Sequence, residues 1–416
     1  MQEAPFEEGR IVVGLDIGTT KICAVAASIS HKGKVRIIGF GQSASKGLNR
    51  GVVTNIKAAV ESIIHAVKEC ELKSGIEISS VYAGIAGHHI QGLNKDGVVA
   101  ITSDTINESD IQRVIECARA CNFPEKEILH TLCQEYIVDG QDGVHNPIGM
   151  AGKRLEAKVH LILGSITSAA NIVQCCNDAD LHVQNVVLEP LASSLAVLEK
   201  EEKELGVILL DIGGGTTDMV IYKNGSIVHT SVLPLGGNQL TNDIAIGLKT
   251  TNEEALRVKH ESGIALKSMV KDGEVIIIKG IARRPDRVID KRLLAEVVEA
   301  RFSEIFQLIY NDIQASGYMP YIAAGVVLTG GSSLMKGLDK LSEEILKMPI
   351  RIGVPFDLEG LGELVESPVY ATAVGLVRYG AEVNMTTDII PSLSGDPMAS
   401  VAKNLKGLID KFFKMF

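Results

Sequence analysis

Two glycine-rich turns, each placed directly after a run of apolar residues, constrain this chain more than any other feature. The stretch "LLDIGGGTTDM" covers residues 209–219, and a weaker copy, "VGLDIGTTK", covers residues 13–21. Asp16 and Asp211 lie 195 residues apart, and each follows an apolar strand and precedes a Gly/Thr turn that leads into a second strand. A duplicated architecture is the economical explanation of this repetition.

Strand-like and helical segments alternate in both halves of the chain. The first half has "RIVVGLDI", "KICAVAAS" and "VRIIGFGQS", and the second repeats that order with "LGVILLDI", "TDMVIYKN" and "SIVHTSVLPLGG". Such alternation is typical of a mixed α/β layer domain. The 416 residues also exceed what one hydrophobic core usually serves. We therefore predict an α/β fold with two core domains around a cleft, each carrying a smaller inserted or appended subdomain.

Local patterns set the expected boundaries of these units. Residues 85–162 have strands of their own around a helical stretch at 108–121, which indicates an inserted subdomain. Pro391, Gly395 and Pro397 lie in a stretch rich in Ser and Thr that is typical of a linker. The predicted units are a first core domain (10–84 plus 163–203), the insertion (85–162), a second core domain (204–238 plus 322–382), its smaller lobe (239–321), a flexible linker (383–400) and a terminal amphipathic helix (401–416).

Charge and cysteine content exclude several classes of protein. The formal net charge of −10 disfavours general binding to nucleic acid. Residues 1–10 lack the features of a secretory signal and no eighteen apolar residues run together, so we expect a cytosolic chain that spans no membrane. Seven irregularly spaced cysteines favour reduced thiols over disulfides. For Cys117, Cys121, Cys175 and Cys176 we expect core packing rather than metal binding.

The two turns suit the binding of a polyphosphate. Glycine lets backbone N–H groups approach a ligand closely, and threonine adds a hydroxyl donor. The aspartates at the strand ends suit Mg²⁺ held through its water molecules, since that ion keeps much of its hydration. One turn alone is equally explained as a hairpin with an aspartate cap, but two copies favour a pair of loops that grip one phosphate chain.

Three further segments fit a nucleotide cleft, although each has an ordinary structural alternative. The stretch "VVLTGGSSLMKGL" at 326–338 offers a flat shelf for an adenosine, or is a common strand-to-helix turn. The helices "EPLASSLAVLE" at 189–199 and "SPVYATAVGLVRYG" at 367–380 carry small residues that let helix backbones come close. Such helices suit a hinge between two halves, or simple tight packing.

In this order, these segments resemble the phosphate, connector and adenosine motifs of the actin and heat-shock chaperone ATPase superfamily. Within it the chain is similar to the FtsA family of bacterial cell-division proteins over nearly its whole length. The stretches that carry the resemblance are "GLDIGTTK", "YAGIAGHHIQGLNKDGVVAI", "EPLASSLAVL", "LLDIGGGTTDM", "GGNQLTNDIA", "AAGVVLTGGSSLMKGL" and "SPVYATAVGL". The resemblance implies that the insertion at 85–162 replaces an actin subdomain on the other side of the first core domain.

The resemblance also implies a set of site residues for ATP and Mg²⁺. The residues that match the first phosphate loop are Gly18, Thr19, Thr20 and Lys21, and those that match the second are Gly213, Gly214, Gly215, Thr216 and Thr217. The third side of the phosphates is matched by Gly236 and Gly237. The nucleoside pocket is matched by Lys259, Gly263, Gly330, Gly331 and Ser332. Asp16 and Asp211 match the magnesium-side carboxylates, and Glu189 the connector acid that organises metal-bound water. Asp211 is the candidate for orienting an attacking water. Lys21 departs from relatives with a small hydroxyl there, so we expect weak or regulatory ATPase activity.

The C-terminal stretch "SVAKNLKGLIDKFFKMF" predicts an amphipathic helix that binds membranes. Its apolar face is formed by Val401, Leu405, Leu408, Ile409, Phe412, Phe413 and Phe416, and its basic face by Lys403, Lys406, Lys411 and Lys414. A helix of this length is too short to span a bilayer, but it fits the interface of an anionic membrane. The alternatives are a helix docked on the protein's own core or on a partner.

For an FtsA-like protein the resemblance implies peripheral attachment to the cytoplasmic face of the cell membrane at the division site. It further implies self-association into actin-like filaments, binding of the C-terminal tail of FtsZ by the lobe at 239–321, and recruitment of later division proteins through the insertion. Arg287 and Arg301 form a cationic cluster that could hold an acidic tail, or a solvated surface. The alternative function is a soluble small-molecule phosphotransferase, which would have no use for the terminal helix. A pilus-assembly relative would share the core but not that helix.

Overall fold

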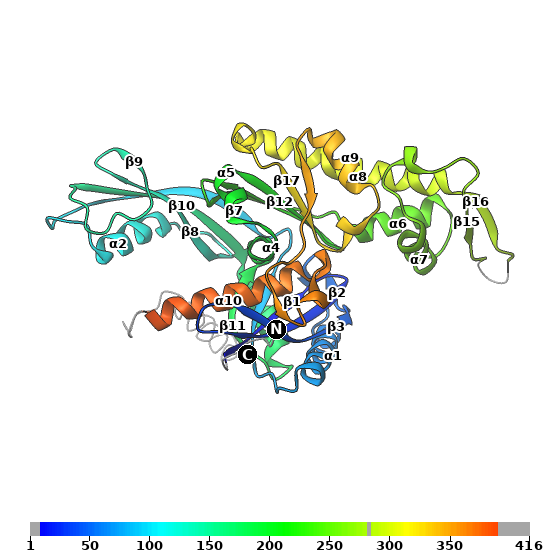
Figure 1. Cartoon of the computed structure of the whole chain (residues 1–416), viewed down its shortest axis with the longest axis horizontal. Coiled ribbons are helices and arrows are strands. Elements are labelled where there is room, and N and C mark those ends of the chain that lie inside the picture. The colour runs from blue at the N-terminus through cyan, green and yellow to red at the C-terminus, as the bar shows by residue number, and fades with distance from the viewer. Residues whose placement is uncertain (1–8, 281–283, 390–416) are drawn as a thin grey trace, which may run out of the picture.

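The computed structural model describes residues 9–280 and 284–389 of the chain (Figure 1). The predicted terminal helix at 401–416 and residues 390–400 of the predicted linker lie outside these described residues. Two β-sheets form the centre of the molecule. In Figure 1 an inserted subdomain extends from this centre at the left, and a helical lobe extends at the right.

The first central sheet has the strand order β11-β6-β1-β2-β3-β19. Its strands are β1 (Arg10–Ile17), β2 (Lys21–Ile29), β3 (Val35–Ala44), β6 (Ser80–Ile85), β11 (His182–Leu188) and the short β19 (Glu359–Gly360). The first three strands form an antiparallel meander, and β6 and β11 add to β1 in parallel. A small hairpin, β4 (Leu48–Asn49) with β5 (Val52–Val53), leads into α1 (Ile56–Ser74), which packs on β3.

The second central sheet repeats this arrangement, with the strand order β14-β13-β12-β17-β18. Its strands are β12 (Val207–Ile212), β13 (Thr217–Lys223), β14 (Ser226–Leu233), β17 (Val326–Thr329) and β18 (Ile350–Ile352). Again three strands form an antiparallel meander and two more add in parallel. Since β1, β2, β3, β6 and β11 correspond in order and direction to β12, β13, β14, β17 and β18, the predicted duplication is confirmed.

The insertion between β6 and the second part of the first core forms its own antiparallel sheet, β7-β10-β8-β9. It consists of β7 (Gln91–Ala100), α2 (Glu108–Arg119), β8 (Lys126–Val138), β9 (Gln141–Val144) and β10 (Arg154–Ser165), followed by α3 (Ile166–Asn177). β10 therefore continues past the predicted boundary at residue 162. The Asn94 side chain donates a 3.0 Å hydrogen bond to the Val228 carbonyl oxygen of β14, so the insertion contacts the second half as well.

The packing predicted for two of the cysteines is wrong. Cys117 and Cys121 are exposed, because α2 turns Val114 and Ala118 toward its sheet and ends at Arg119, before Cys121. Cys175 and Cys176 are buried on α3, as predicted. The cysteines of the described residues are free thiols.

The helical lobe and the second sheet share one continuous hydrophobic core. The lobe comprises α6 (Gly237–Gly247), α7 (Asn252–Ser262), the hairpin β15 (Val275–Ile278) with β16 (Arg287–Asp290), and the long α8 (Lys291–Ser316); α9 (Leu338–Leu346) follows β17. Short 3-10 turns lie at Lys267–Met269, Met319–Tyr321, Gly331–Leu334, Gly362–Val365 and Pro368–Tyr370. Phe302 of α8 is buried and also lines the cleft described below, which connects this core to the cleft wall.

Two helices cross between the halves, α4 (Glu189–Val197) and α10 (Ala371–Ile389), and α5 (Lys200–Leu205) follows the first of them. A Cβ atom on Gly375 would overlap the Ala192 backbone, so this crossing requires a glycine. Because α10 continues to Ile389, residues 383–389 are helical, and the linker predicted from residue 383 does not begin there. Within residues 9–280 and 284–389, no helix has both the length and the apolar character that a membrane crossing needs.

Candidate functional site

A cleft of about 700 Å³ lies between the two halves of the molecule. Its walls come from both glycine-rich turns, the start of α6, the end of α7, the turn after β17 and the turn before α10. Every residue predicted to contact nucleotide lines this cleft except Thr217 and Gly236. Thr217 is buried and its hydroxyl donates to the Leu235 carbonyl oxygen, 2.9 Å away.

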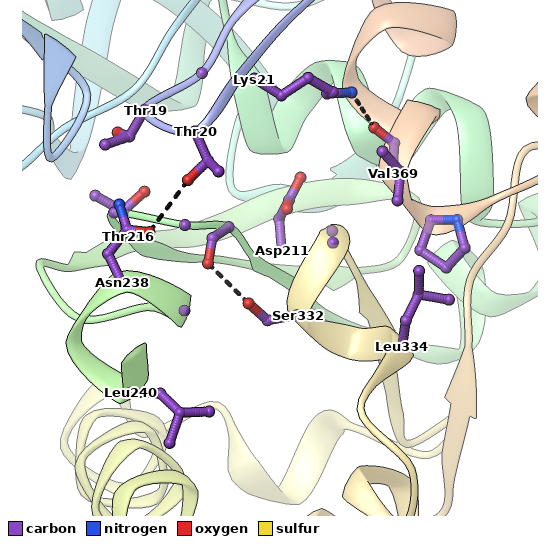
Figure 2. Close-up of a pocket in the computed structure, with 18 of the residues that line it drawn as sticks. Thr19, Thr20, Lys21, Asp211, Thr216, Asn238, Leu240, Ser332, Leu334 and Val369 are labelled. Atoms are coloured by element: carbon purple, nitrogen blue, oxygen red, sulfur yellow. Dashed lines mark hydrogen bonds between the residues drawn. The ribbon is translucent and has the colours of Figure 1, made fainter. Parts of the chain in front are cut away.

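The two glycine-rich turns face each other across the cleft (Figure 2). Thr20 Oγ1 of the first turn lies 3.4 Å from Asn238 Oδ1, which follows the second turn at the start of α6. A Cβ atom on Gly214 would overlap Thr20, and one on Gly215 would lie 2.5 Å from Thr19 Oγ1. Side chains in the second turn would therefore block the approach of the loops, which explains why this turn contains so few.

The start of α6 closes the third side of the phosphate region. The backbone N–H groups of Gly237 and Asn238 donate to the carbonyl oxygens of Gly213 and Gly214, at 3.0 and 2.8 Å. A Cβ atom on Gly236 would lie 2.7 Å from the Gly213 oxygen. Gly236 thus supports the turn from behind, while Gly237 reaches the cleft.

Four carboxyl groups gather on the floor of the cleft, from Asp16, Glu189, Asp211 and Asp218. Asp16 and Asp211 occupy equivalent places near the ends of β1 and β12. Burial raises the pKa of Asp16 to about 6 and that of Asp218 to about 7. Burial also raises the pKa of Asp211 and, well above its ordinary value, that of Glu189, to which the neighbouring carboxylates add. These raised pKa values indicate that the surroundings supply too little positive charge to stabilise all four carboxylates in their ionised form.

This donor set fits a hydrated divalent cation. The carboxylates are hard oxygen donors, and Asp218 Oδ1 is buried without a hydrogen-bond partner. Within the described part of the chain, no group of three or more His, Cys, Asp or Glu residues converges closely enough to hold a metal directly. An ion such as Mg²⁺, which keeps most of its water ligands, matches both observations.

Asp218 is a residue of the site that the sequence prediction missed. It pairs with Asp211 across the β12–β13 hairpin, and its Oδ2 accepts a 2.8 Å hydrogen bond from the Thr216 hydroxyl. The signal was present as the second aspartate of "DIGGGTTD", seven residues after the first. In an antiparallel hairpin with a four-residue turn, those two positions lie opposite each other.

Lys21 points away from the second phosphate loop, toward the turn that precedes α10 (Figure 2). Its Nζ donates to the Val369 carbonyl oxygen at 2.5 Å and lies 5.0 Å from the centre of the Tyr370 ring. The same Nζ is 3.7 Å from Asp16 Oδ2. Lys21 thus balances part of the charge of the acidic floor.

The nucleoside side of the cleft combines polar anchors with an apolar wall. Lys259 Nζ donates to the Gly237 carbonyl oxygen at 3.0 Å and to Thr241 Oγ1 at 2.9 Å, and burial lowers its pKa to about 8. The Ser332 hydroxyl donates to the Gly213 oxygen at 3.0 Å, joining this side to the second turn. Gly330 has φ +80°, which glycine adopts readily, and a Cβ atom there would overlap Asp211 Oδ1. Leu240, Leu256, Phe302, Leu334 and Met335 form the apolar wall.

The two arginines predicted to bind a partner differ in their environment. Arg301 pairs with Asp243, at 2.5 Å, and with Glu304, so its charge is largely balanced within the lobe. Arg287 is exposed on β16 and donates to the carbonyl oxygens of Leu248 and Lys249, at 2.6 and 3.1 Å. Neither residue lines the cleft.

Comparison with known sequences gives consistent matches to one family. The model described as "Cell division protein FtsA" matches residues 208–375, and that described as "SHS2 domain inserted in FTSA" matches residues 87–163. Cell division protein FtsA of Pseudomonas aeruginosa is 43% identical over 97% of this chain and 98% of its own length. The Escherichia coli protein of the same name is 37% identical over 90% of this chain and 91% of its own length.

Solved structures match at lower identity and support the fold. A chain of the PilM-PilN type IV pilus biogenesis complex aligns with a TM-score of 0.65 and 17% identity, over 91% of this chain and 99% of that one. MreB5 of Spiroplasma citri bound to ADP aligns with a TM-score of 0.55 and 16% identity, over 93% of this chain and 100% of that one. These likenesses confirm the predicted actin-like ATPase fold.

Proposed function

Because this chain belongs to the FtsA family of cell division proteins, we propose that it binds ATP in the cleft between its halves and assembles into actin-like filaments at the inner face of the cytoplasmic membrane. The observation that carries this proposal is the pair of glycine-rich turns that face each other (Figure 2), next to four carboxyl groups of which those of Asp16, Asp211 and Asp218 are buried. Such turns supply backbone donors to a phosphate chain, and the carboxylates call for a counter-cation. A relative in fold, MreB5, has been crystallised with ADP.

A bound Mg²⁺ would neutralise part of the triphosphate charge. Asp16 and Asp211 would hold its water shell, and Glu189, at the start of α4, would orient a further water molecule. Lys21 restrains the turn before α10 while balancing Asp16. Hydrolysis is slow or regulatory in this scheme, since Lys21 is engaged by the Val369 carbonyl oxygen and Asp16 and does not activate a water molecule.

We assign membrane attachment to the amphipathic helix that the sequence predicts at residues 401–416. Each large apolar side chain that inserts contributes up to ~1.5–3 kcal/mol, and each lysine near an anionic surface adds up to ~1 kcal/mol. Such a helix would place the protein on the cytoplasmic face at the division site, where the insertion at 85–162 recruits later division proteins. A soluble phosphotransferase would not need this segment.

Assembly on a supported anionic bilayer tests nucleotide, polymer and membrane together. We expect the full chain to form filaments on the bilayer with Mg-ATP, and a variant lacking residues 401–416 to lose both filaments on the surface and sedimentation with anionic vesicles. Neutral vesicles serve as the control, because the lysine contribution is absent there. Unchanged sedimentation of the shortened chain would refute the membrane assignment, and nucleotide-independent assembly would refute the role of the cleft.

Tethering of FtsZ is proposed for the lobe that carries α6 and β16. Arg287 is exposed there and can meet an acidic tail, whereas Arg301 is held by Asp243 and Glu304. We expect Arg287→Glu to weaken binding of an FtsZ tail peptide by about tenfold, the effect of losing roughly 1.4 kcal/mol. Lys249→Glu, in the same part of the lobe, tests whether any charge reversal has this effect. Equal affinity of Arg287→Glu and the unaltered protein, measured by fluorescence anisotropy, would remove Arg287 from the contact.

A further inference from the structure

One oxygen of the Asp211 carboxylate is held by two hydroxyl groups that come from different helices. The Ser193 hydroxyl donates to Asp211 Oδ2 at 2.7 Å, and the Thr372 hydroxyl donates to the same oxygen at 3.4 Å. The two hydroxyl oxygens are 3.0 Å apart and hydrogen-bond to each other, so with Ser193 donating to the carboxylate the Thr372 proton is shared between Ser193 Oγ and Asp211 Oδ2. All three side chains are buried, so water does not compete for these bonds.

The three groups join the two halves of the molecule where α4 and α10 cross. Asp211 lies in β12 of the second sheet, Ser193 lies in α4, and Thr372 lies in the first turn of α10. α10 packs on the first sheet so closely that a Cβ atom on Gly14 of β1 would overlap the Ala373 backbone. The orientation of a carboxylate in the second half is therefore set in part by a helix seated on the first.

The other oxygen of Asp211 lies beside a glycine that lines the cleft. Oδ1 lies beside Gly330, where only the absence of a side chain leaves room for it. A carboxylate free to rotate could present either oxygen, and the Ser193 donor, itself held by the Thr372 hydroxyl, restricts that freedom at Oδ2. Oδ1 is consequently presented to whatever occupies the phosphate region.

We propose that Ser193 and Thr372 are positioning residues, which hold Oδ2 of Asp211 so that Oδ1 receives the hydrated Mg²⁺ of a bound nucleotide. This inference rests on the proposed binding of Mg-ATP and deepens it. In this proposal the two hydroxyls act through Asp211, although Thr372 also lines the cleft. Because Thr372 belongs to α10, the geometry of the metal side also depends on how the two halves are placed.

The neighbouring serine shows that this arrangement is more than the routine pairing of a buried hydroxyl. Ser194 on the same helix donates to the Leu191 carbonyl oxygen at 2.7 Å, the usual bond of a serine to the preceding helical turn, and lies 2.6 Å from the Tyr222 hydroxyl. Ser193 is equally buried, but directs its hydroxyl to the carboxylate. Ser194 is therefore a matched control, with the same residue type, helix and burial, and no contact with Asp211.

The test compares ATP affinity with Mg²⁺ and with a chelator in the full chain, by isothermal titration calorimetry. We expect Ser193→Ala and Thr372→Val each to reduce the gain in affinity that Mg²⁺ confers by about 10-fold to 100-fold, as the loss of an outer partner of a metal ligand does. Ser194→Ala should keep the full gain. Thr372→Ser, which restores a hydroxyl, should recover most of it.

The possible outcomes separate this inference from the proposed function. An unaltered protein that does not bind ATP, or binds it equally without Mg²⁺, refutes the proposed function and the inference together. A normal Mg²⁺ gain in both variants refutes the inference alone. So does an equal loss of affinity with and without Mg²⁺, because that pattern indicates structural damage. Thermal unfolding measurements check that each variant is folded. If Ser193→Ala fails to fold, Thr372→Val, which preserves the side-chain shape, tests the inference by itself.

Discussion

Replacing Asp211 by asparagine is expected to lower the affinity for Mg-ATP by on the order of 100-fold while making the nucleotide-free protein more resistant to heat. The loss follows because one negative charge near a divalent cation, in a site shielded from bulk water, is worth about 3 kcal/mol or more. The amide keeps the shape of the side chain and can still accept from Ser193 and Thr372. The effect therefore reports on charge rather than on packing.

The gain in stability has a separate cause. Burial raises the pKa of Asp211, which means that the folded protein binds a proton there more tightly than the unfolded chain does. At neutral pH the ionised carboxylate consequently reduces the free energy of unfolding, and the neutral amide removes this cost. Opposite effects on binding and stability are typical of residues kept for function.

Calorimetry with Mg-ATP and a thermal melt in chelator measure the two effects. Asp104→Asn makes the same chemical change on an exposed loop of the insertion, and should leave both quantities unchanged. Equal Mg-ATP affinity of Asp211→Asn and the unaltered protein would refute the magnesium-side assignment. A lower melting temperature would show that the carboxylate stabilises the fold instead of straining it.

The features that could be predicted from the sequence are those encoded locally. An apolar strand, a Gly/Thr turn and a second strand lie within a dozen residues of each other, so the residues around Asp16 and Asp211 predict both hairpins together with their duplication. In each sheet the hairpin forms the first two strands of a three-strand antiparallel meander. The two sheets therefore have matching strand orders. The structure also confirms the prediction that the cleft lies between the two hairpins, since the turns of both hairpins line it.

The features that could not be predicted depend on contacts between distant segments. Phe302 and Leu240 have the helical spacing of core residues, and periodicity does not distinguish a core from the apolar wall of a cleft. The sequence predicts Lys21 beside the phosphates, yet its partner is the Val369 carbonyl, 348 positions along the chain. Burial of the Asp218 carboxyl is likewise a product of the assembled fold. The sequence does not predict that residues 383–389 are helical. The prolines that follow the end of this helix make the whole stretch resemble a linker.

Asp218 is expected to stabilise the nucleotide-free protein at a pH of about 4 and to lose this contribution as pH rises to about 7, and Asp218→Asn is expected to remove the contribution. Burial, together with the nearby Asp211 carboxylate, raises the pKa of Asp218 from 3.8 to about 7. The folded state therefore holds a proton that the unfolded chain releases near pH 4. The stabilisation is complete below that pH and is lost as pH rises through the folded-state value.

Asp16 acts in the same direction, with its pKa raised to about 6, whereas His130 and His160, whose pKa values burial lowers to about 4, act in the opposite direction. The difference between Asp218→Asn and the unaltered protein therefore isolates the contribution of Asp218. Because a tenfold change in proton affinity corresponds to about 1.4 kcal/mol, Asp218 alone contributes a change of several kcal/mol across this range. Urea unfolding in chelator at pH 5 and pH 7.5 measures it, with Asp104→Asn as the control that should keep the full slope. Parallel curves for Asp218→Asn and the unaltered protein would show that Asp218 is not protonated in the fold. If the cleft binds Mg-ATP as proposed, the nucleotide should suppress this loss at pH 7.5, because a cation would then replace the protons that balance the acidic floor.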